Sequence, residues 1–322
     1  MDTIGRFNFA DGVSIAGCKA HTKTDPEAGD WILAGTEYGP SMTLRYLILD
    51  RSGAVKAHGN YESPRMIYLH DFFATERYLI FVLHPVEFSA FGMLAGLNSF
   101  TDSLTWSPDQ GNLVMIVNKS GGKPVMLEAP AAFVWHGFNA YERGEEIVAD
   151  FVGYDDPDHF IGANPAFKSV MRGEVGEARF PGKLCRYVMS PRQRKLTEEI
   201  LHAGHHEFPM IDGRVAGRTN RYGYANRGPD GNWVLDGVVK LNLQTGGREE
   251  YRFGAKHFVS EPIFAPKGSA EGDGWLLAQV QNGATGTNFL AIFDTDHVAA
   301  GPIAKVHLTH HVPLSFHGYW AA

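Results

Sequence analysis

The sequence is poor in cysteine, has no excess of positive charge and contains no long apolar run. Cys18 and Cys185 are the only cysteines in 322 residues, too few for a disulfide framework, which fits a reducing compartment. The 29 basic and 36 acidic side chains give a formal net charge of -7. No positive field is therefore available for a phosphate backbone, and we expect no nucleic-acid partner.

Signals for export and for membrane insertion are also missing. Residues 1–7 contain no cationic stretch followed by an apolar run, so no secretory signal is predicted. Nowhere do about 18 consecutive apolar residues occur, so no transmembrane segment is predicted. We therefore expect a cytoplasmic location.

The sequence is instead rich in short apolar and aromatic runs. Hydrophobic residues make up 44% of the chain and aromatic residues 12%, which is enough for a large core. Runs of strand length, bounded by turn-forming residues, occur at residues 31–35, 43–50, 78–83 and 112–117. This pattern predicts an all-β fold. Because no low-complexity linker interrupts it, we expect one domain over residues 1–322.

Two segments allow two interpretations each. Residues 191–201 are compatible with a helix or with a pair of strands around a charged turn. Residues 88–97 are apolar and interrupted by glycine. They are compatible with a loop packed onto the domain, or with an exposed apolar lip that touches a membrane or an apolar substrate.

Four histidines in strand-like settings are the strongest functional signal: His21, His70, His136 and His317. They lie too far apart in the chain for one helix or one finger to join them. A β-propeller, whose blades converge on one axis, would bring them together. Each histidine alone has an ordinary explanation as a core or surface residue, so the prediction depends on the set.

Four neutral imidazoles would suit a transition metal. They leave two positions open on an octahedral ion, which favours iron(II) over closed tetrahedral zinc. Carboxylates that accept the outer ring N–H groups would fix the tautomers and offset the charge of the ion. Glu207 and Glu261, each close to a proline and apolar neighbours, are placed for this role, although solvated turn charges have the same spacing.

These residues lie in six motifs that resemble the carotenoid cleavage oxygenase family. The motifs follow the order of the family over nearly the whole chain: residues 20–26, 69–72, 136–142, 207–209, 260–262 and 316–318. The resemblance implies a seven-bladed β-propeller with a non-haem iron(II) on its axis. By motif, the iron ligands are His21, His70, His136 and His317. Glu207 then supports His136, and Glu261 supports His317.

The same resemblance implies the activity. Members of the family use O2 to cleave a carbon-carbon double bond of a conjugated apolar substrate into two carbonyl products, without an organic cofactor. We expect a carotenoid or apocarotenoid substrate, with the stilbene cleavage of lignostilbene oxygenases as the alternative. Aromatic residues beside the motifs are candidates for lining the substrate tunnel: Phe72, Phe138, Phe264 and Phe316. Residues 88–100 are the candidate for peripheral membrane contact.

The chain departs from the family at its N-terminal end. Only 20 residues precede His21, whereas family members have a longer segment there, including a glutamate that supports the second histidine. The resemblance therefore predicts an N-terminally truncated, incomplete propeller in which His70 lacks its carboxylate. An inactive remnant or interaction protein is the alternative to an enzyme. A calcium-dependent propeller hydrolase is disfavoured because it needs carboxylate and amide oxygens on the axis.

Overall fold

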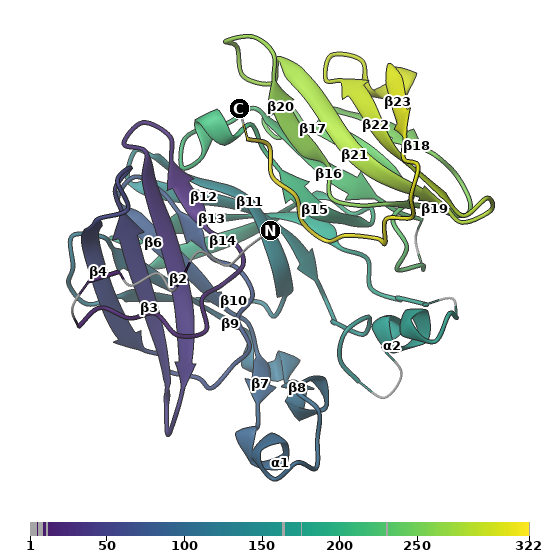
Figure 1. The fold of residues 1–322 in the computed structure, drawn as a ribbon. Helices are drawn as coiled ribbons and strands as arrows, with labels where there is room; N and C mark the ends of the chain where they lie inside the picture. The colour runs from purple at the N-terminus through teal and green to yellow at the C-terminus, as the bar shows by residue number, and fades with distance from the viewer. Residues whose placement is uncertain are drawn as a thin grey trace.

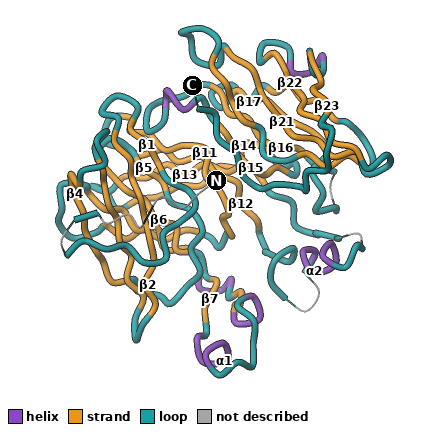
Figure 2. Tube along the Cα trace, viewed as in Figure 1, coloured by secondary structure: helices purple, strands orange, loops and turns teal. Residues whose placement is uncertain are grey.

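The computed structural model describes residues 5, 9, 10, 12–162, 165–174, 176–229 and 231–321. These residues form five larger sheets around the middle of the molecule, a two-stranded hairpin and two short helices at the rim (Figure 1). Strands dominate the trace, and the helices lie outside the sheets (Figure 2). The all-β prediction is confirmed.

Each sheet is built from strands that are neighbours in the chain. The first contains β1 (Lys23–Asp25), β2 (Asp30–Tyr38), β3 (Met42–Leu49) and β4 (Val55–Glu62). The second contains β5 (Phe73–Ala74), β6 (Tyr78–Leu83), β9 (Asn112–Asn118) and β10 (Val125–Ala129). The third contains β11 (Phe133–Arg143), β12 (Glu146–Tyr154), β13 (Lys183–Ser190) and β14 (Lys195–His202). Pairing within all three is antiparallel, as in propeller blades.

The remaining elements complete the molecule. The fourth sheet contains β15 (His206–Met210), β16 (Tyr222–Arg227), β17 (Gly237–Asn242) and β18 (Arg248–Arg252). The fifth contains β19 (His257–Val259), β20 (Ile263–Pro266), β21 (Gly274–Asn282), β22 (Thr287–Asp294) and β23 (Ala304–His307). The hairpin is β7 (Val86–Phe88) with β8 (Leu104–Trp106). The helices are α1 (Ala90–Leu94), α2 (Ala166–Met171) and the 3-10 turns η1 (Thr101–Ser103), η2 (Pro108–Gln110), η3 (Gly213–Val215) and η4 (Val298–Ala300).

Four apolar cores hold consecutive sheets together. Each core takes side chains from the facing surfaces of two neighbouring sheets, in order Ile32 with Phe81, Ile80 with Phe151, Val152 with Val239, and Val238 with Phe293. Alternate residues of one strand therefore serve two different cores, as the two-residue period of a strand requires. The strands β1, β5, β11 and β15 contact one another in turn. Segments that are remote in sequence thus meet at one place.

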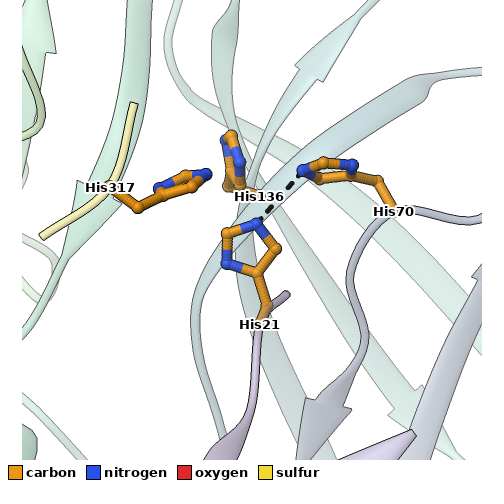
Figure 3. Close-up of side chains that lie close together, drawn as sticks. All are labelled: His21, His70, His136 and His317. Carbon is orange, nitrogen blue, oxygen red and sulfur yellow. Dashed lines mark hydrogen bonds between the residues drawn. The ribbon is translucent and has the colours of Figure 1, made fainter. Parts of the chain in front are cut away.

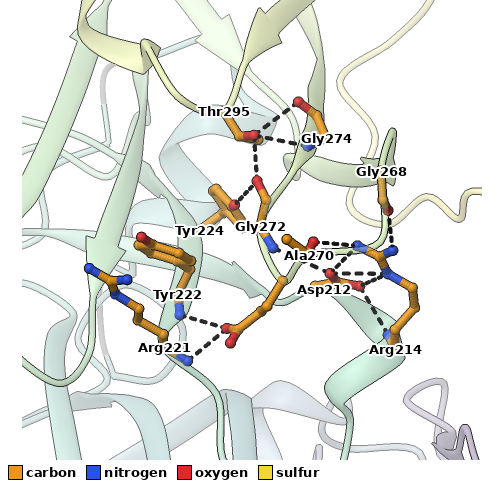
Figure 4. A network of polar contacts seen from close by, with 11 residues as sticks. Asp212, Arg214, Arg221, Tyr222, Tyr224, Gly268, Ala270, Gly272, Gly274 and Thr295 are labelled. Carbon is orange, nitrogen blue, oxygen red and sulfur yellow. Dashed lines mark hydrogen bonds and ion pairs between the residues drawn. The ribbon is translucent and has the colours of Figure 1, made fainter.

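A polar network fixes the fifth sheet to the fourth (Figure 4). The side chain of Arg214 pairs with Asp212 at 2.6 Å and donates to the carbonyl of Gly268 at 2.5 Å. Glu271 accepts the backbone N–H groups of Arg221 and Tyr222 at 2.7 and 2.9 Å. The loop between β20 and β21 is therefore tied to the sheet that begins with β15.

Several sequence predictions have a clear outcome in the fold. Residues 191–201 form a turn followed by β14, so the strand-pair interpretation is the right one. Residues 88–97 contain α1 and agree with each interpretation in part. Phe88 is buried and Ala90 and Met93 pack against the domain, whereas Phe91, Leu94 and Leu97 are exposed by 80%, 81% and 75%. Across the described ranges, no helix is long and apolar enough to cross a bilayer.

Candidate metal centre

Four imidazole rings from remote segments meet at the middle of the molecule (Figure 3). One ring nitrogen from each of His21, His70, His136 and His317 lies within 4.8 Å of the other three. The ring centroid of His21 is 4.9, 4.6 and 4.5 Å from those of His70, His136 and His317. The Nε2 atoms of His21 and His70 are 3.1 Å apart.

Three of the four histidines lie in or just before the first strand of a sheet. His21 precedes β1, His70 precedes β5, and His136 lies within β11. The pairing of β11 with β12 shifts register on both sides of Gly137, and such bulges re-aim side chains near functional sites. His317 lies in the segment after β23, which crosses from the fifth sheet to the middle of the molecule (Figure 1).

Glu207 holds the ring of His136. The Nδ1 atom of His136 lies 2.6 Å from Oε2 of Glu207, and the carboxylate is only 1% exposed. The same oxygen accepts the backbone N–H of Phe208, whose φ of 52° lies in the left-handed region that is costly for a residue with a side chain. Glu207 thus fixes both the ring and the next peptide.

Glu261 holds His317 in a similar way. The Nδ1 atom of His317 lies 3.2 Å from Glu261, and the backbone N–H of Gly318 donates to the same carboxylate at 2.9 Å. The segment is further held by a 3.3 Å bond from the N–H of Ser315 to the hydroxyl of Ser260. The contact between Glu261 and His317 is longer and more exposed than the contact between Glu207 and His136.

Asp71 connects three of the histidine segments, a role that the sequence did not reveal. Its carboxylate follows His70, pairs with Lys23 at 2.8 Å and accepts the N–H of Gly137 at 3.0 Å. Burial raises the pKa of Asp71, but the positive charge of Lys23 leads the effects that lower it, and the net result is about 2. Asp71 is therefore ionised and holds the residues beside His21, His70 and His136.

The electrostatics of the cluster suit a bound cation. Burial lowers the pKa of His21 to about 3 and that of His70 to about 2, so both rings are neutral and offer lone pairs. Burial also acts to lower the pKa of His136, but the Glu207 carboxylate outweighs it and the pKa is raised. A positive charge is thus favoured on the inner side of His136.

The residues present fit a transition-metal ion. The Nε2 atom of His136 is buried and has no hydrogen-bond partner in the described structure, which leaves its lone pair for a ligand bond. Two nitrogens that are each about 2.1 Å from one ion lie at most about 4.2 Å apart. The observed limit of 4.8 Å requires shifts of only a few tenths of an ångström per ring.

Comparison with known proteins agrees with the motifs and the geometry. The profile of the family described as retinal pigment epithelial membrane protein (RPE65), which includes the carotenoid cleavage oxygenases, matches residues 1–322. The chain belongs to this family. The apocarotenoid-15,15'-oxygenase of Synechocystis is 29% identical over 331 residues, which cover 100% of this chain and 66% of that enzyme.

Other carotenoid cleavage oxygenases give the same result. The isoeugenol monooxygenase of Pseudomonas nitroreducens is 28% identical, over 99% of this chain and 69% of that enzyme. A solved structure of the cobalt-substituted Synechocystis apocarotenoid oxygenase superposes with a TM-score of 0.86 at 28% identity, covering 94% of this chain and 64% of that one. The chain thus spans only about two thirds of these relatives, and five sheets of the seven-bladed family propeller are described.

An apolar cavity opens beside the four histidines. It measures about 260 Å³ and is lined by His70, His136 and His317 together with Trp135, Phe167, Phe208, Trp233 and Phe316. A second cavity of about 470 Å³ shares Phe208, Trp233 and Phe316 with it. A larger, polar cavity of about 770 Å³ touches none of the four histidines. One apolar cavity therefore lies directly at the histidine cluster.

The tunnel candidates among the phenylalanines occupy different places. Phe316 lies on the wall of the apolar cavity. Phe72 is fully buried between the first and second sheets, Phe138 between the third and fourth, and Phe264 between the fourth and fifth. These three pack in cores and do not line this cavity. Trp135, Phe167, Phe208 and Trp233 take the wall positions instead.

Proposed function

We propose that this chain is an iron(II)-dependent oxygenase that uses O2 to cleave a carbon-carbon double bond of a carotenoid or apocarotenoid. The two oxygen atoms of O2 end in the two carbonyl groups that replace the double bond. The observation that carries the proposal is the cluster of four imidazoles, supported by two carboxylates, at the end of an apolar cavity. Because the chain spans part of its relatives, the activity of those enzymes applies to it only as a proposal.

The residues of the chain have distinct roles in this proposal. His21, His70, His136 and His317 would hold the iron, which when bound supplies the means to activate O2. Glu207 and Glu261 accept ring N–H groups and so keep the inner nitrogen lone pairs of His136 and His317 free. The aromatic wall excludes water and holds a conjugated chain beside the cluster.

The lining of the cavity favours a hydrocarbon over a phenol. Apart from the histidines and Glu207, its wall consists of alanine, phenylalanine and tryptophan. A site that binds a phenol needs a polar partner for the hydroxyl group, since an unpaired buried hydroxyl is costly. Stilbene cleavage remains the second candidate, because the resveratrol cleavage oxygenase 1 of Aspergillus fumigatus, whose named substrate is a hydroxylated stilbene, is 26% identical over 99% of this chain.

Metal analysis tests the iron site. Purified protein reconstituted with ferrous ion without oxygen should contain about one iron per chain, and His136→Ala should contain much less. Equal iron in the two proteins would remove His136 as a ligand. Absence of iron from both would leave the chain as an inactive remnant of the family.

Oxygen uptake tests the substrate. With the reconstituted protein, we expect O2 consumption and two carbonyl products from an apocarotenoid, and little from a hydroxylated stilbene. The reverse order of rates would assign stilbene cleavage. Iron binding without turnover of either compound would refute the proposed activity while leaving the metal site intact.

We also propose that residues 88–100, which include α1, touch a lipid surface. Phe91, Leu94 and Leu97 project into solvent at the rim, and carotenoid-like substrates partition into bilayers. The double variant Phe91→Ser/Leu94→Ser should sediment less with phosphatidylcholine vesicles than the parent. The matched change Ile200→Ser/Ile303→Ser removes two other exposed apolar side chains and should have no effect. Equal sedimentation of all three would refute this contact.

A further inference from the structure

His70, a partly buried histidine of the cluster, has a support that is not a carboxylate. The Nδ1 atom of His70 lies 2.7 Å from the hydroxyl oxygen of Tyr68. Glu207 and Glu261 occupy the equivalent position for His136 and His317. Within the described part of the chain, no carboxylate forms a hydrogen bond to His70.

The phenol of Tyr68 is held firmly in this position. The backbone N–H of Tyr68 donates to the carbonyl of Val86 at 2.9 Å. Its ring lies 6.0 Å from Trp135 and 5.8 Å from Phe160 between centroids. Trp135 also meets the ring of His70 edge-on at 4.7 Å. The spacing of two residues in an extended segment puts Tyr68 and His70 on the same side of the backbone.

A phenol differs from a carboxylate in what it imposes on the imidazole. An ionised carboxylate only accepts, so Glu207 commits His136 to the tautomer with a proton on Nδ1. A phenol can donate or accept. Binding of a cation through Nε2 of His70 requires a proton on Nδ1, and the oxygen of Tyr68 is placed to accept it.

The charges around the cluster are compatible with an uncharged support for His70. Glu207 and Glu261 supply two negative charges beside the cluster, which equal the charge of a divalent ion, and Asp71 is already paired with Lys23. A phenol orients His70 without adding charge.

We propose that Tyr68 is the positioning residue of His70, which accepts the Nδ1 proton and so turns Nε2 toward a divalent metal ion. The proposal rests on the metal site proposed above. It gives the ring of His70 a hydrogen-bonded support within the described structure. It also predicts that loss of the Tyr68 hydroxyl lowers metal affinity through His70 and leaves the fold unchanged.

The test compares two variants that each lose one hydroxyl. Tyr68→Phe removes the contact with His70, whereas Tyr38→Phe removes a hydroxyl that donates to the carbonyl of Ile67 at 3.0 Å. Cobalt(II) is titrated into apo protein against a chromophoric chelator, and the visible cobalt spectrum is recorded. We expect Tyr68→Phe to bind about 10- to 100-fold more weakly with a shifted spectrum, and Tyr38→Phe to match the parent.

The outcomes separate this proposal from the metal site itself. Equal cobalt binding by the parent and by His136→Ala would refute the metal site. The proposed role of Tyr68 would then be refuted as well. Suppose that His136→Ala binds cobalt more weakly than the parent, but that a folded Tyr68→Phe has the affinity and spectrum of the parent. This result would refute the role of Tyr68 and leave the metal site intact. If Tyr68→Phe does not fold, nitrogen-15 NMR of the zinc-loaded parent decides. A slowly exchanging Nδ1 proton on His70 supports the bond, and one that exchanges as fast as in an exposed histidine refutes it.

Discussion

At the scale of single residues, the two carboxylates that hold histidines of the cluster, Glu207 and Glu261, differ in the strength of their contacts. Glu207 is buried and 2.6 Å from its ring, whereas Glu261 is 3.2 Å from a more exposed ring. A short, buried, charge-assisted contact holds its partner more firmly than a longer exposed one. The site should therefore tolerate loss of charge at Glu261 better than at Glu207.

Glu261→Gln should weaken iron retention without unfolding the protein. A glutamine can offer its nitrogen as well as its oxygen to His317, so the tautomer is no longer fixed. We expect a loss of about 10-fold in affinity, and a loss nearer about 100-fold for Glu207→Gln. Iron remaining through a dialysis series measures both, with the exposed Glu128→Gln as the control. Retention at the parental level in Glu261→Gln would contradict its assigned role.

Asp71→Asn should destabilise the fold and the cluster together. The neutral amide leaves Lys23 without its charge partner and cannot accept all the N–H groups that the carboxylate accepts. A buried donor without a partner costs about 1–3 kcal/mol. Urea unfolding should show this loss, and cobalt affinity should also fall. Asp109→Asn, on the exposed η2 turn, should change neither. An unchanged unfolding midpoint in Asp71→Asn would refute its connecting role.

The sequence predicted the four histidines that cluster in the structure, but not every residue that holds them. His21, His70, His136 and His317 stand in motifs, and Glu207 and Glu261 follow from the same resemblance. Asp71 joins partners 48 and 66 residues away, which only the meeting of β1, β5 and β11 brings together. Tyr68 could have been found from its spacing of two residues before His70 in an extended segment.

At the scale of elements, strands with strong apolar patterns could be predicted and irregular segments could not. Residues 78–83 form β6 with the expected bounds, because their apolar character serves the cores on both faces. The segment around α1 is also apolar, but it buries Phe88 and leaves Phe91 and Leu94 exposed, so composition alone could not fix its structure. The segment of His317 contains no strand after β23 and is held by separate polar contacts.

The strands β5 and β11 pack closely at Gly137 of β11. A Cβ atom there would lie 2.1 Å from Cε1 of Phe73, a buried side chain of β5. Gly137→Ala should therefore push β5 from β11 at a cost of about 1–3 kcal/mol. Because His70 and His136 flank this contact, cobalt affinity should fall as well. Thermal unfolding and titration would measure both effects.

Gly213→Ala is the matched control for this packing argument. An added Cβ at Gly213 meets nothing within 4 Å, and the change should stay within about 0.5 kcal/mol of the parent. If Gly137→Ala behaves in the same way, the contact between β5 and β11 does not determine the position of the histidines.

At the scale of the whole molecule, the cores connect the sheets in sequence but do not form a closed ring in the described structure. Each of the four intersheet cores joins one sheet to the next, and none joins the fifth to the first. The outer face of the first sheet packs instead on Phe9, Val13 and Ile15. His21 and His317, from the segments at these two ends, meet with ring centroids 4.5 Å apart.

A bound metal ion should therefore stabilise the whole molecule. One ion shared by the four rings would link the first, second and third sheets to the segment that follows the fifth. A ligand that binds only the folded state at 100 times its Kd adds about 2.7 kcal/mol to the free energy of unfolding. Cobalt(II) at that concentration should raise the Tm of the parent by several degrees, and a chelator should reverse the rise. In His21→Ala the same cobalt concentration should give a much smaller rise, because the link between the first sheet and the C-terminal segment is lost; an equal rise would show that the ion binds elsewhere.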